Sequence, residues 1–177
     1  MVTARVCKVM KTLFLLRHAK SSWKEDGIAD LDRPLNERGR GAAPFIGRLL
    51  RERGFAPDLI VSSPARRARK TAKLVQEAGE FDAPLLFDER IYEASPGSLL
   101  NVAAETDDGV NSLMLVGHNP GMEGLVRVLT GNSEPMPTAA VAVIDLAIDA
   151  WENSAPGRGT LRAIIRPRDE MDRSGTI

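Results

Sequence analysis

Short apolar runs alternate along the chain with longer segments in which apolar residues recur every three or four positions. The runs predict strands at Thr12–Leu16, Asp58–Val61, Pro84–Phe87, Ser112–Val116, Ala140–Leu146 and Thr160–Ile165. Alternation of strand-like and helix-like segments is typical of β-α-β units and favours an α/β fold. We therefore expect a three-layer αβα sandwich with a mostly parallel central sheet and helices on both faces. The last two strands are joined by a loop with Pro156 and Gly157, and they need no helix between them.

The helical segments carry recognisable ends. The apolar spacing from Ala42 to Leu50 predicts a helix that ends at Gly54 and either starts near Gly41 or bends at Pro44. Three residue pairs each predict a helix N-cap followed by proline in the first turn. Ser63-Pro64 begins a helix that is expected to end at Gly79, and Asn119-Pro120 begins one that is expected to end near Gly131. Ser95-Pro96 begins a third helix between these two. The resulting organisation is a lead-in at residues 1–10, a single domain at 11–167 and a polar tail at 168–177.

Composition narrows the function classes. The 24 Lys and Arg residues balance 24 Asp and Glu, and the chain holds 5 Phe, 2 Trp and 1 Tyr, which argues against a nucleic-acid binder. The longest apolar run, Ala139–Ile144, is far too short to span a bilayer, and the N-terminus lacks the pattern of a signal peptide. A single cysteine, Cys7, excludes an intrachain disulfide. We therefore predict a cytoplasmic protein without a nucleic-acid or membrane partner.

The only two histidines, His18 and His118, each stand just beyond an apolar run. In open α/β sheets, ligands bind in the crevice outside the carboxyl ends of the strands. Both histidines are therefore expected in one crevice, although each, taken singly, is equally typical of a partly buried polar residue without chemistry.

A third loop, from Ser62 to Thr71, places Arg66, Arg67, Arg69 and Lys70 at or near the start of a predicted helix. Cations are unfavourable there because the helix dipole and the unpaired N–H groups attract anions. An anion bound at this helix end would remove the conflict. A solvated basic helix face is the alternative, which accounts well for Arg69 and Lys70. Spacing leaves open whether Arg66 or Arg67 points into the crevice.

Two imidazoles with Arg17 and an arginine of this loop form a cationic set suited to a phosphoryl group, because a guanidinium matches phosphate oxygens with two parallel donors. Two histidines are also typical of metal sites, but neither loop has a carboxylate directly beside its histidine. We expect no metal and no cofactor.

Three ordered motifs resemble a known family. Leu16–Trp23 resembles the arginine-histidine signature of the histidine phosphatase (phosphoglycerate-mutase-like) superfamily, Ser62–Thr71 its second arginine motif, and Val116–Asn119 its second-histidine motif. The Asp32–Gly39 and Tyr92–Ser95 segments and the short length look most like the SixA branch, the phosphohistidine phosphatases. The resemblance runs from about Lys11 to Pro167.

The resemblance implies roles for particular residues. His18 is implied as the nucleophile that becomes phosphorylated, with Arg17, Arg67 and His118 around the phosphoryl oxygens. The family arginine precedes a small residue and lies four positions before a threonine, which selects Arg67 rather than Arg66. Ser21 and Asn119, within the first and third motifs, are expected to contact the substrate.

The resemblance also bears on the general acid. Superfamily members that act on esters protonate the leaving group with a carboxylic acid, and Glu89 and Glu93 lie in the corresponding region, although both are equally typical of surface carboxylates. The predicted function is hydrolysis of phosphohistidine on a protein. The alternatives are a small-molecule phosphomonoesterase and a phosphate-binding module without turnover.

Overall fold

The computed structural model describes residues 10–23 and 27–175 of the chain. The predicted lead-in, apart from Met10, therefore lies outside the described residues, as does Cys7. No helix in these two ranges is both long enough and apolar enough to cross a membrane.

The structure confirms every predicted strand to within a residue or two. The strands are β1 (Lys11–Arg17), β2 (Leu59–Ser62), β3 (Leu85–Phe87), β4 (Ser112–Gly117), β5 (Val141–Leu146) and β6 (Gly159–Ile165). They form one sheet in the order β3-β2-β4-β1-β5-β6. The pairs from β3 through β1 are parallel, and β5 pairs antiparallel with both β1 and β6. The mostly parallel α/β fold is thus confirmed.

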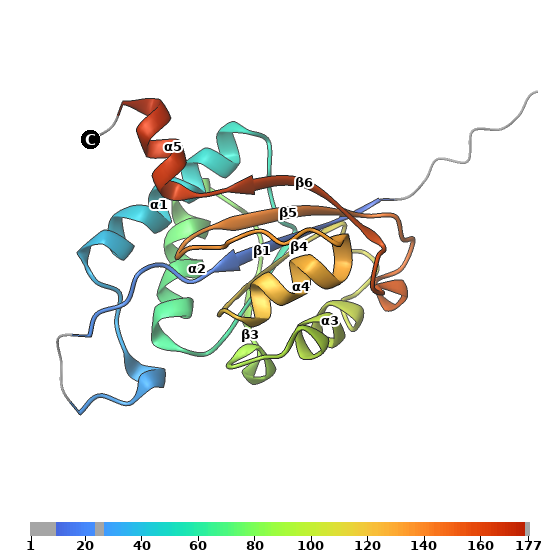
Figure 1. Ribbon diagram of the computed structural model, residues 1–177, viewed down its shortest axis with the longest axis horizontal. Coiled ribbons are helices and arrows are strands. Elements are labelled where there is room, and N and C mark those ends of the chain that lie inside the picture. The colour runs from blue at the N-terminus through green and yellow to red at the C-terminus, as the bar shows by residue number, and fades with distance from the viewer. Residues whose placement is uncertain (1–9, 24–26, 176–177) are drawn as a thin grey trace, which may run out of the picture.

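Helices cover both faces of this sheet (Figure 1). The α-helices are α1 (Glu37–Glu52), α2 (Arg66–Gly79), α3 (Pro96–Ala104), α4 (Gly121–Thr130) and α5 (Pro167–Ser174), with short 3-10 turns η1 (Asp30–Asp32), η2 (Glu89–Ile91) and η3 (Trp151–Asn153). Helices α1 and α2 pack on one face, and α3 and α4 pack on the other. The three layers follow because each face of the sheet needs an apolar cover.

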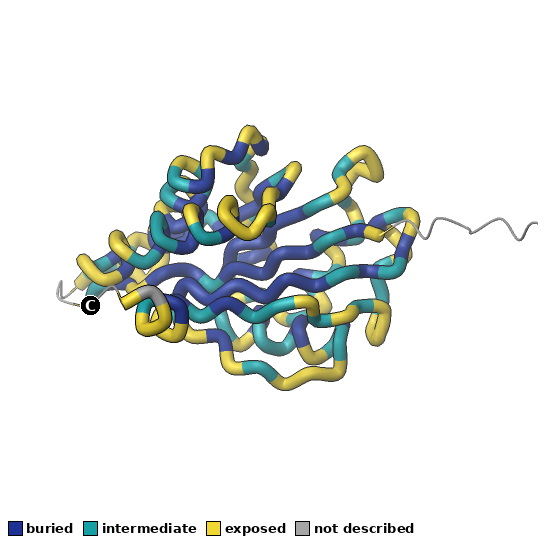
Figure 2. Tube along the Cα trace, turned by 90° about the horizontal axis from the view of Figure 1, so that it is seen from above, coloured by how far each residue is buried: buried dark blue, intermediate teal, exposed yellow. Residues whose placement is uncertain are grey.

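The central strand β1 shows how the sequence builds two cores. Successive strand side chains point to opposite faces, so Leu13 and Leu15 join the core under α3 and α4, while Phe14 and Leu16 join the core under α1 and α2. Figure 2 shows buried residues concentrated along the central strands and exposed residues on the outer helices and loops. The rigid centre of the sheet thus supports the loops that leave its strands.

Three helix starts, those of α1, α2 and α4, differ from their predictions. Helix α1 begins at Glu37 rather than near Gly41, because the Asn36 side chain caps it by accepting a hydrogen bond from the Gly39 N–H, and Pro44 lies within the helix. Helix α2 begins at Arg66, so Ser63 is not its N-cap.

The Ser95 cap and the helix ends at Gly79 and near Gly131 are as predicted. Helix α1 ends at Glu52, two residues before Gly54, which follows the Arg53 C-cap with a positive φ. Helix α4 begins at Gly121, one residue later than the Asn119-Pro120 pair indicates.

The predicted polar tail also contains regular structure. Pro167 starts α5, acidic residues occupy its first turn, and Arg53 of the α1 C-cap donates to Glu170 at 2.6 Å. Acidic residues near a helix N-terminus are favoured by the dipole, so a polar sequence is sufficient for a short packed helix here.

Candidate active site

Three neighbouring strands deliver the candidate residues to one edge of the sheet. Arg17 ends β1 and pairs in register with Gly117, the end of β4. The next residues, His18 and His118, therefore lie side by side, with ring centroids 5.1 Å apart. Strand β2 lies on the other side of β4 and ends at Ser62, where the arginine-rich loop begins. All three loops therefore lie together at the carboxyl ends of these strands, as the sequence predicts.

Arg17, His18, Arg67 and His118 line one cavity of about 610 Å³. The other lining residues are Glu93, Ala94, Ser95, Pro96, Asn119, Pro120 and Gly121. The cavity therefore joins the carboxyl ends of β1 and β4 to the starts of α2, α3 and α4.

Hydrogen bonding fixes the tautomer of His18. Its Nδ1 lies 2.8 Å from the Ala19 carbonyl oxygen, which can only accept, so Nδ1 carries the proton and Nε2 carries the lone pair. Burial lowers the pKa of His18 to about 4; the Ala19 hydrogen bond opposes this, and the positive charges of Arg67 and Arg17 reinforce it. His18 is thus a neutral imidazole at pH 7 with an unprotonated Nε2.

His118 has the opposite tautomer. Its Nδ1 faces Arg67 Nη2 at 3.4 Å, and a guanidinium only donates, so the ring proton lies on Nε2 and is directed to Ser63 Oγ at 2.8 Å. Burial lowers its pKa to about 3, reinforced by His18 and Arg67. Tyr92 packs edge-on against the ring, with centroids 5.5 Å apart.

The guanidinium group of Arg17 is only partly hydrogen-bonded within the described residues. Its Nη1 donates to the Met136 carbonyl at 2.9 Å, while its Nε has no hydrogen-bond partner within the described residues. Burial lowers the pKa of Arg17, and the nearby Glu123 carboxylate raises it. Glu123 also accepts from the Met136 N–H at 2.8 Å, so it ties α4 to the segment that positions Arg17.

The structure separates the two arginines that spacing leaves open. Arg67 is 6% exposed and lines the cavity, whereas Arg66 is exposed and lines a different groove. Arg67 Nη2 donates to the Asp30 carboxylate at 2.8 Å, and Tyr92 Oη donates to the same oxygen at 2.8 Å. Burial would raise the pKa of Asp30, but the Tyr92 and Arg67 hydrogen bonds outweigh it and lower the pKa to about 2.

Of the four remaining predicted site residues, Glu93 and Asn119 line the cavity, whereas Glu89 and Ser21 do not. Glu93 lines the cavity, with its backbone in the left-handed region at φ 51°, whereas Glu89 is exposed on η2 and does not line it. Ser21 contacts Arg33 Nη2 through its hydroxyl and is not a lining residue. Asn119 lines the cavity, but its amide group donates to Glu123 and to the Met136 carbonyl.

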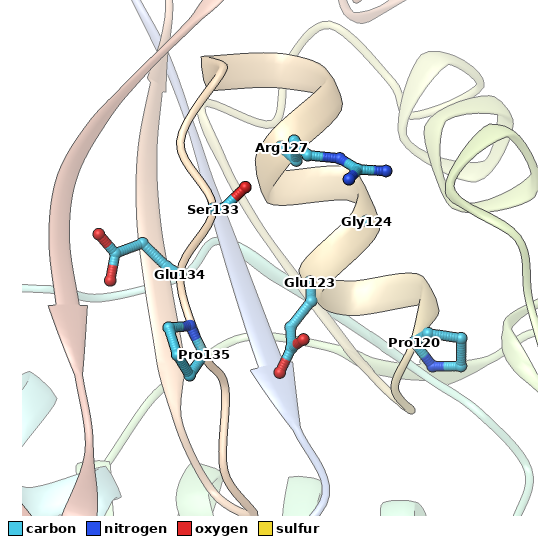
Figure 3. A pocket seen from close by; sticks show the side chains of 7 residues that line it. All are labelled: Pro120, Glu123, Gly124, Arg127, Ser133, Glu134 and Pro135. Atoms are coloured by element: carbon cyan, nitrogen blue, oxygen red, sulfur yellow. The ribbon is translucent and has the colours of Figure 1, made fainter.

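A smaller cavity of about 370 Å³ lies next to this one, between α4 and residues 133–135 (Figure 3). Its charged lining is mixed, with Glu123, Arg127 and Glu134, and the Glu134 side chain points away from α4 and pairs with Arg166 at 2.6 Å. It shares only Pro120 with the cavity of the two histidines. Neither histidine lines it, so it does not replace the cationic cavity as the candidate site.

Sequence reasoning missed four polar partners: Ser63, Asp30, Tyr92 and Glu123. Two of these partners lie far along the chain from the candidate site residues that they contact, with 55 residues between Ser63 and His118 and 37 residues between Asp30 and Arg67. The sequence indicated the Tyr92–Ser95 segment only as part of the family resemblance and predicted no contact for the Tyr92 side chain. In the described ranges, no three His, Cys, Asp or Glu side chains are grouped so that they could hold a metal ion.

A neutral imidazole with an available lone pair beside guanidinium groups is chemically suited to phosphoryl transfer. The comparisons with known proteins agree. Residues 13–127 match the family model described as "Histidine phosphatase superfamily (branch 1)". An uncharacterized protein of Mycobacterium tuberculosis is 37% identical over 164 residues, which cover 86% of this chain and 100% of that protein. The chain belongs to the histidine phosphatase superfamily.

Two further similarities refine this placement. The crystal structure of a candidate phosphohistidine phosphatase SixA from Agrobacterium tumefaciens is 34% identical, with a TM-score of 0.76, covering 89% of this chain and 98% of that one. A 2,3-bisphosphoglycerate-dependent phosphoglycerate mutase of Thermobifida fusca is 38% identical over 93 residues, only 51% of this chain and 38% of the mutase. The similarity to the SixA protein therefore extends over much more of the chain.

Proposed function

We propose that this protein is a phosphatase that hydrolyses phosphohistidine on a protein substrate through a covalent intermediate on His18. The observation that carries the proposal is the neutral His18, whose Nε2 keeps its lone pair in a cavity shared with Arg17, Arg67 and His118. A protonated imidazole has no lone pair with which to attack phosphorus, so the low pKa of His18 favours nucleophilic catalysis.

In the first step, His18 Nε2 forms a bond to phosphorus while the bond from phosphorus to the substrate imidazole breaks. The electron pair of that bond goes to the leaving nitrogen, which takes up a proton from solvent. Arg17, Arg67 and His118 stabilise the charge on the transferring oxygens. All three of these residues line the cavity together with His18.

In the second step, a water oxygen attacks phosphorus, and the bond to His18 breaks with its electron pair returning to Nε2. Inorganic phosphate leaves, and the proton of the water passes to solvent. An imidazole is a much less basic leaving group than an alkoxide, so the first step needs little general-acid help. This matches a site in which the candidate carboxylates, Glu89 and Glu93, are both exposed.

The similarity to the Agrobacterium tumefaciens protein supports phosphohistidine as the substrate. A panel of protein phosphohistidine, phosphoaspartate, phosphoserine and sugar phosphates tests this choice. Wild-type protein is expected to hydrolyse phosphohistidine with a kcat/KM at least about 100-fold above that for the esters, since general-acid assistance contributes about 10²- to 10⁴-fold where it is needed. Comparable rates on sugar phosphates, or activity lost to a chelator and restored by a divalent metal, would contradict the proposal.

A small-molecule phosphomonoesterase is the second candidate function. One observation favours it: the Glu93 backbone adopts the left-handed region, which is uncommon outside glycine, and the residue lines the cavity with His118. In this function the Glu93 carboxylic acid would protonate an alkoxide leaving group.

The pair Glu93→Gln and Glu89→Gln tests this second function. Glu93→Gln is expected to lower kcat/KM for glycerol phosphate about 100-fold, the size of a general-acid contribution, and that for phosphohistidine less than about threefold. Glu89→Gln is the matched control and is expected to change neither, because its side chain does not line the cavity. Equal effects of the two substitutions on the ester would exclude Glu93 as the general acid.

A further inference from the structure

A second cationic region lies beside the active-site cavity, on the exposed face of α2. Arg66, Arg69, Lys70 and Lys73 are spaced i, i+3, i+4 and i+7, which places them on one side of the helix, and all four are exposed. Together with Arg40 of α1 they line a groove of about 650 Å³. The remaining lining residues are Leu31, Asp32, Pro34, Leu35 and Pro64.

The charge of this groove is unbalanced. None of its five cations forms an ion pair with a carboxylate in the part of the chain that the structure describes. Like charges three or four positions apart on a helix repel one another, and the first turn of α2 contains no acidic residue to offset the helix dipole. An anionic ligand in the groove would relieve both unfavourable interactions.

The groove and the active site share a wall. Asp30, at the start of η1, binds Arg67 on the active-site side, and the next two residues, Leu31 and Asp32, line the groove. On α2, Arg66 lines the groove and the next residue, Arg67, lines the active-site cavity. A chain whose phosphorylated side chain enters the cavity can therefore continue across η1 into the groove.

The lining favours a peptide over a nucleic acid. Its apolar residues are aliphatic, with Leu31 40% exposed, and none of the described residues that line it is aromatic, so bases have no ring there on which to stack. The exposed ring of Phe87 lies outside this lining and is already in contact with Arg69, whose guanidinium carbon lies 5.0 Å from the ring centroid.

We propose that this groove binds an acidic segment of the protein substrate that lies next to the phosphohistidine in space. The inference rests on the proposed function and adds a specificity-determining surface to it. Complementary charges across an interface mainly raise the rate of encounter and the selection of the partner, so the groove acts on KM and not on the chemical step.

The test uses the triple variant Arg69→Gln/Lys70→Gln/Lys73→Gln and three substrates. These are free phosphohistidine, a phosphohistidine peptide flanked by glutamates, and the same peptide flanked by glutamines. The triple variant is expected to lose about tenfold in kcat/KM on the acidic peptide, through KM, because it can no longer form three exposed ion pairs with the glutamates, each of which contributes modestly. The other two substrates are expected to change less than about twofold. A control, Arg48→Gln/Arg158→Gln/Arg168→Gln, removes the same charge from exposed positions outside the groove.

Binding of the unphosphorylated acidic peptide, measured by fluorescence anisotropy, separates the groove from the chemistry. Weaker binding by the triple variant than by the control supports the groove even if the wild-type protein hydrolyses none of the substrates. Equal binding by both variants overturns it. Binding of a single-stranded oligonucleotide tighter than that of the peptide, and abolished in the triple variant, also overturns it in favour of a nucleic-acid surface.

Discussion

A His18→Asn variant is expected to lose phosphatase turnover by at least about 10⁴-fold, the effect typical of removing a catalytic nucleophile. Asparagine keeps a polar side chain of similar reach but provides no basic lone pair to attack phosphorus. Radiolabelled substrate, quenched during turnover, is expected to leave label on the wild-type protein and none on the variant. The label is expected to be acid-labile and alkali-stable, as a phosphorus–nitrogen bond on imidazole requires.

Two controls separate the nucleophile from the fold. Lys20→Gln, at an exposed position two residues away, is expected to keep wild-type turnover and labelling. His118→Asn is expected to slow turnover while the label still forms on His18, because His118 stabilises charge and does not attack. A His18→Asn protein that keeps more than a tenth of wild-type activity would exclude the covalent mechanism.

Because the pKa of His18 is low, the His18→Asn substitution is also expected to change how the free energy of unfolding depends on pH. The pKa of His18 is about 4 in the folded protein, against an ordinary value of 6.5, so between these pH values the unfolded chain binds more protons than the native one. The free energy of unfolding of the wild type therefore falls as pH drops from about 6.5 to about 4, by on the order of 3 kcal/mol through this group. His18→Asn removes this contribution, so its stability is expected to fall less over the same window.

Much of the fold was predictable because the strand pattern is set by local residues. Leu13 to Leu16 are apolar on both faces, which is typical of a buried strand with helices on each side. The direction of β5 was not predictable, since the run Ala140–Leu146 reads the same in either orientation. The Ser63 cap failed for another reason: its hydroxyl accepts from the Ala65 N–H before the helix starts and also contacts His118.

The meeting of the two histidines was predictable for a similar reason, since parallel neighbouring strands end at the same edge. Their tautomers were not, because these depend on Ala19 and Arg67, whose positions only the folded chain defines. Asp30 was not identified either, because its hydrogen bond to Arg67 spans 37 residues. The substitutions His18→Asn, His118→Asn and Arg67→Gln test the catalytic roles of these residues.

Arg67→Gln is expected to lower kcat/KM for free phosphohistidine about 10²- to 10³-fold, the loss typical of removing one preorganised donor to developing negative charge. The matched control is Arg66→Gln, which removes the same charge from the preceding residue and is expected to change this rate less than about threefold. The contrast follows from burial, since Arg67 is 6% exposed and lines the cavity while Arg66 is exposed on the groove side.

Arg67→Lys separates the geometry of this group from its charge. A lysine keeps the positive charge but lacks the planar pair of donors that fits two phosphoryl oxygens, so turnover is expected to stay at least about tenfold below wild type. Weaker inhibition by vanadate in both Arg67 variants would show that the defect lies in anion binding, and unchanged thermal unfolding would show that it does not arise from the fold. Equal losses in Arg66→Gln and Arg67→Gln would instead mean that the helix end acts as a diffuse positive field, because a diffuse field depends on total charge and not on which guanidinium reaches the cavity.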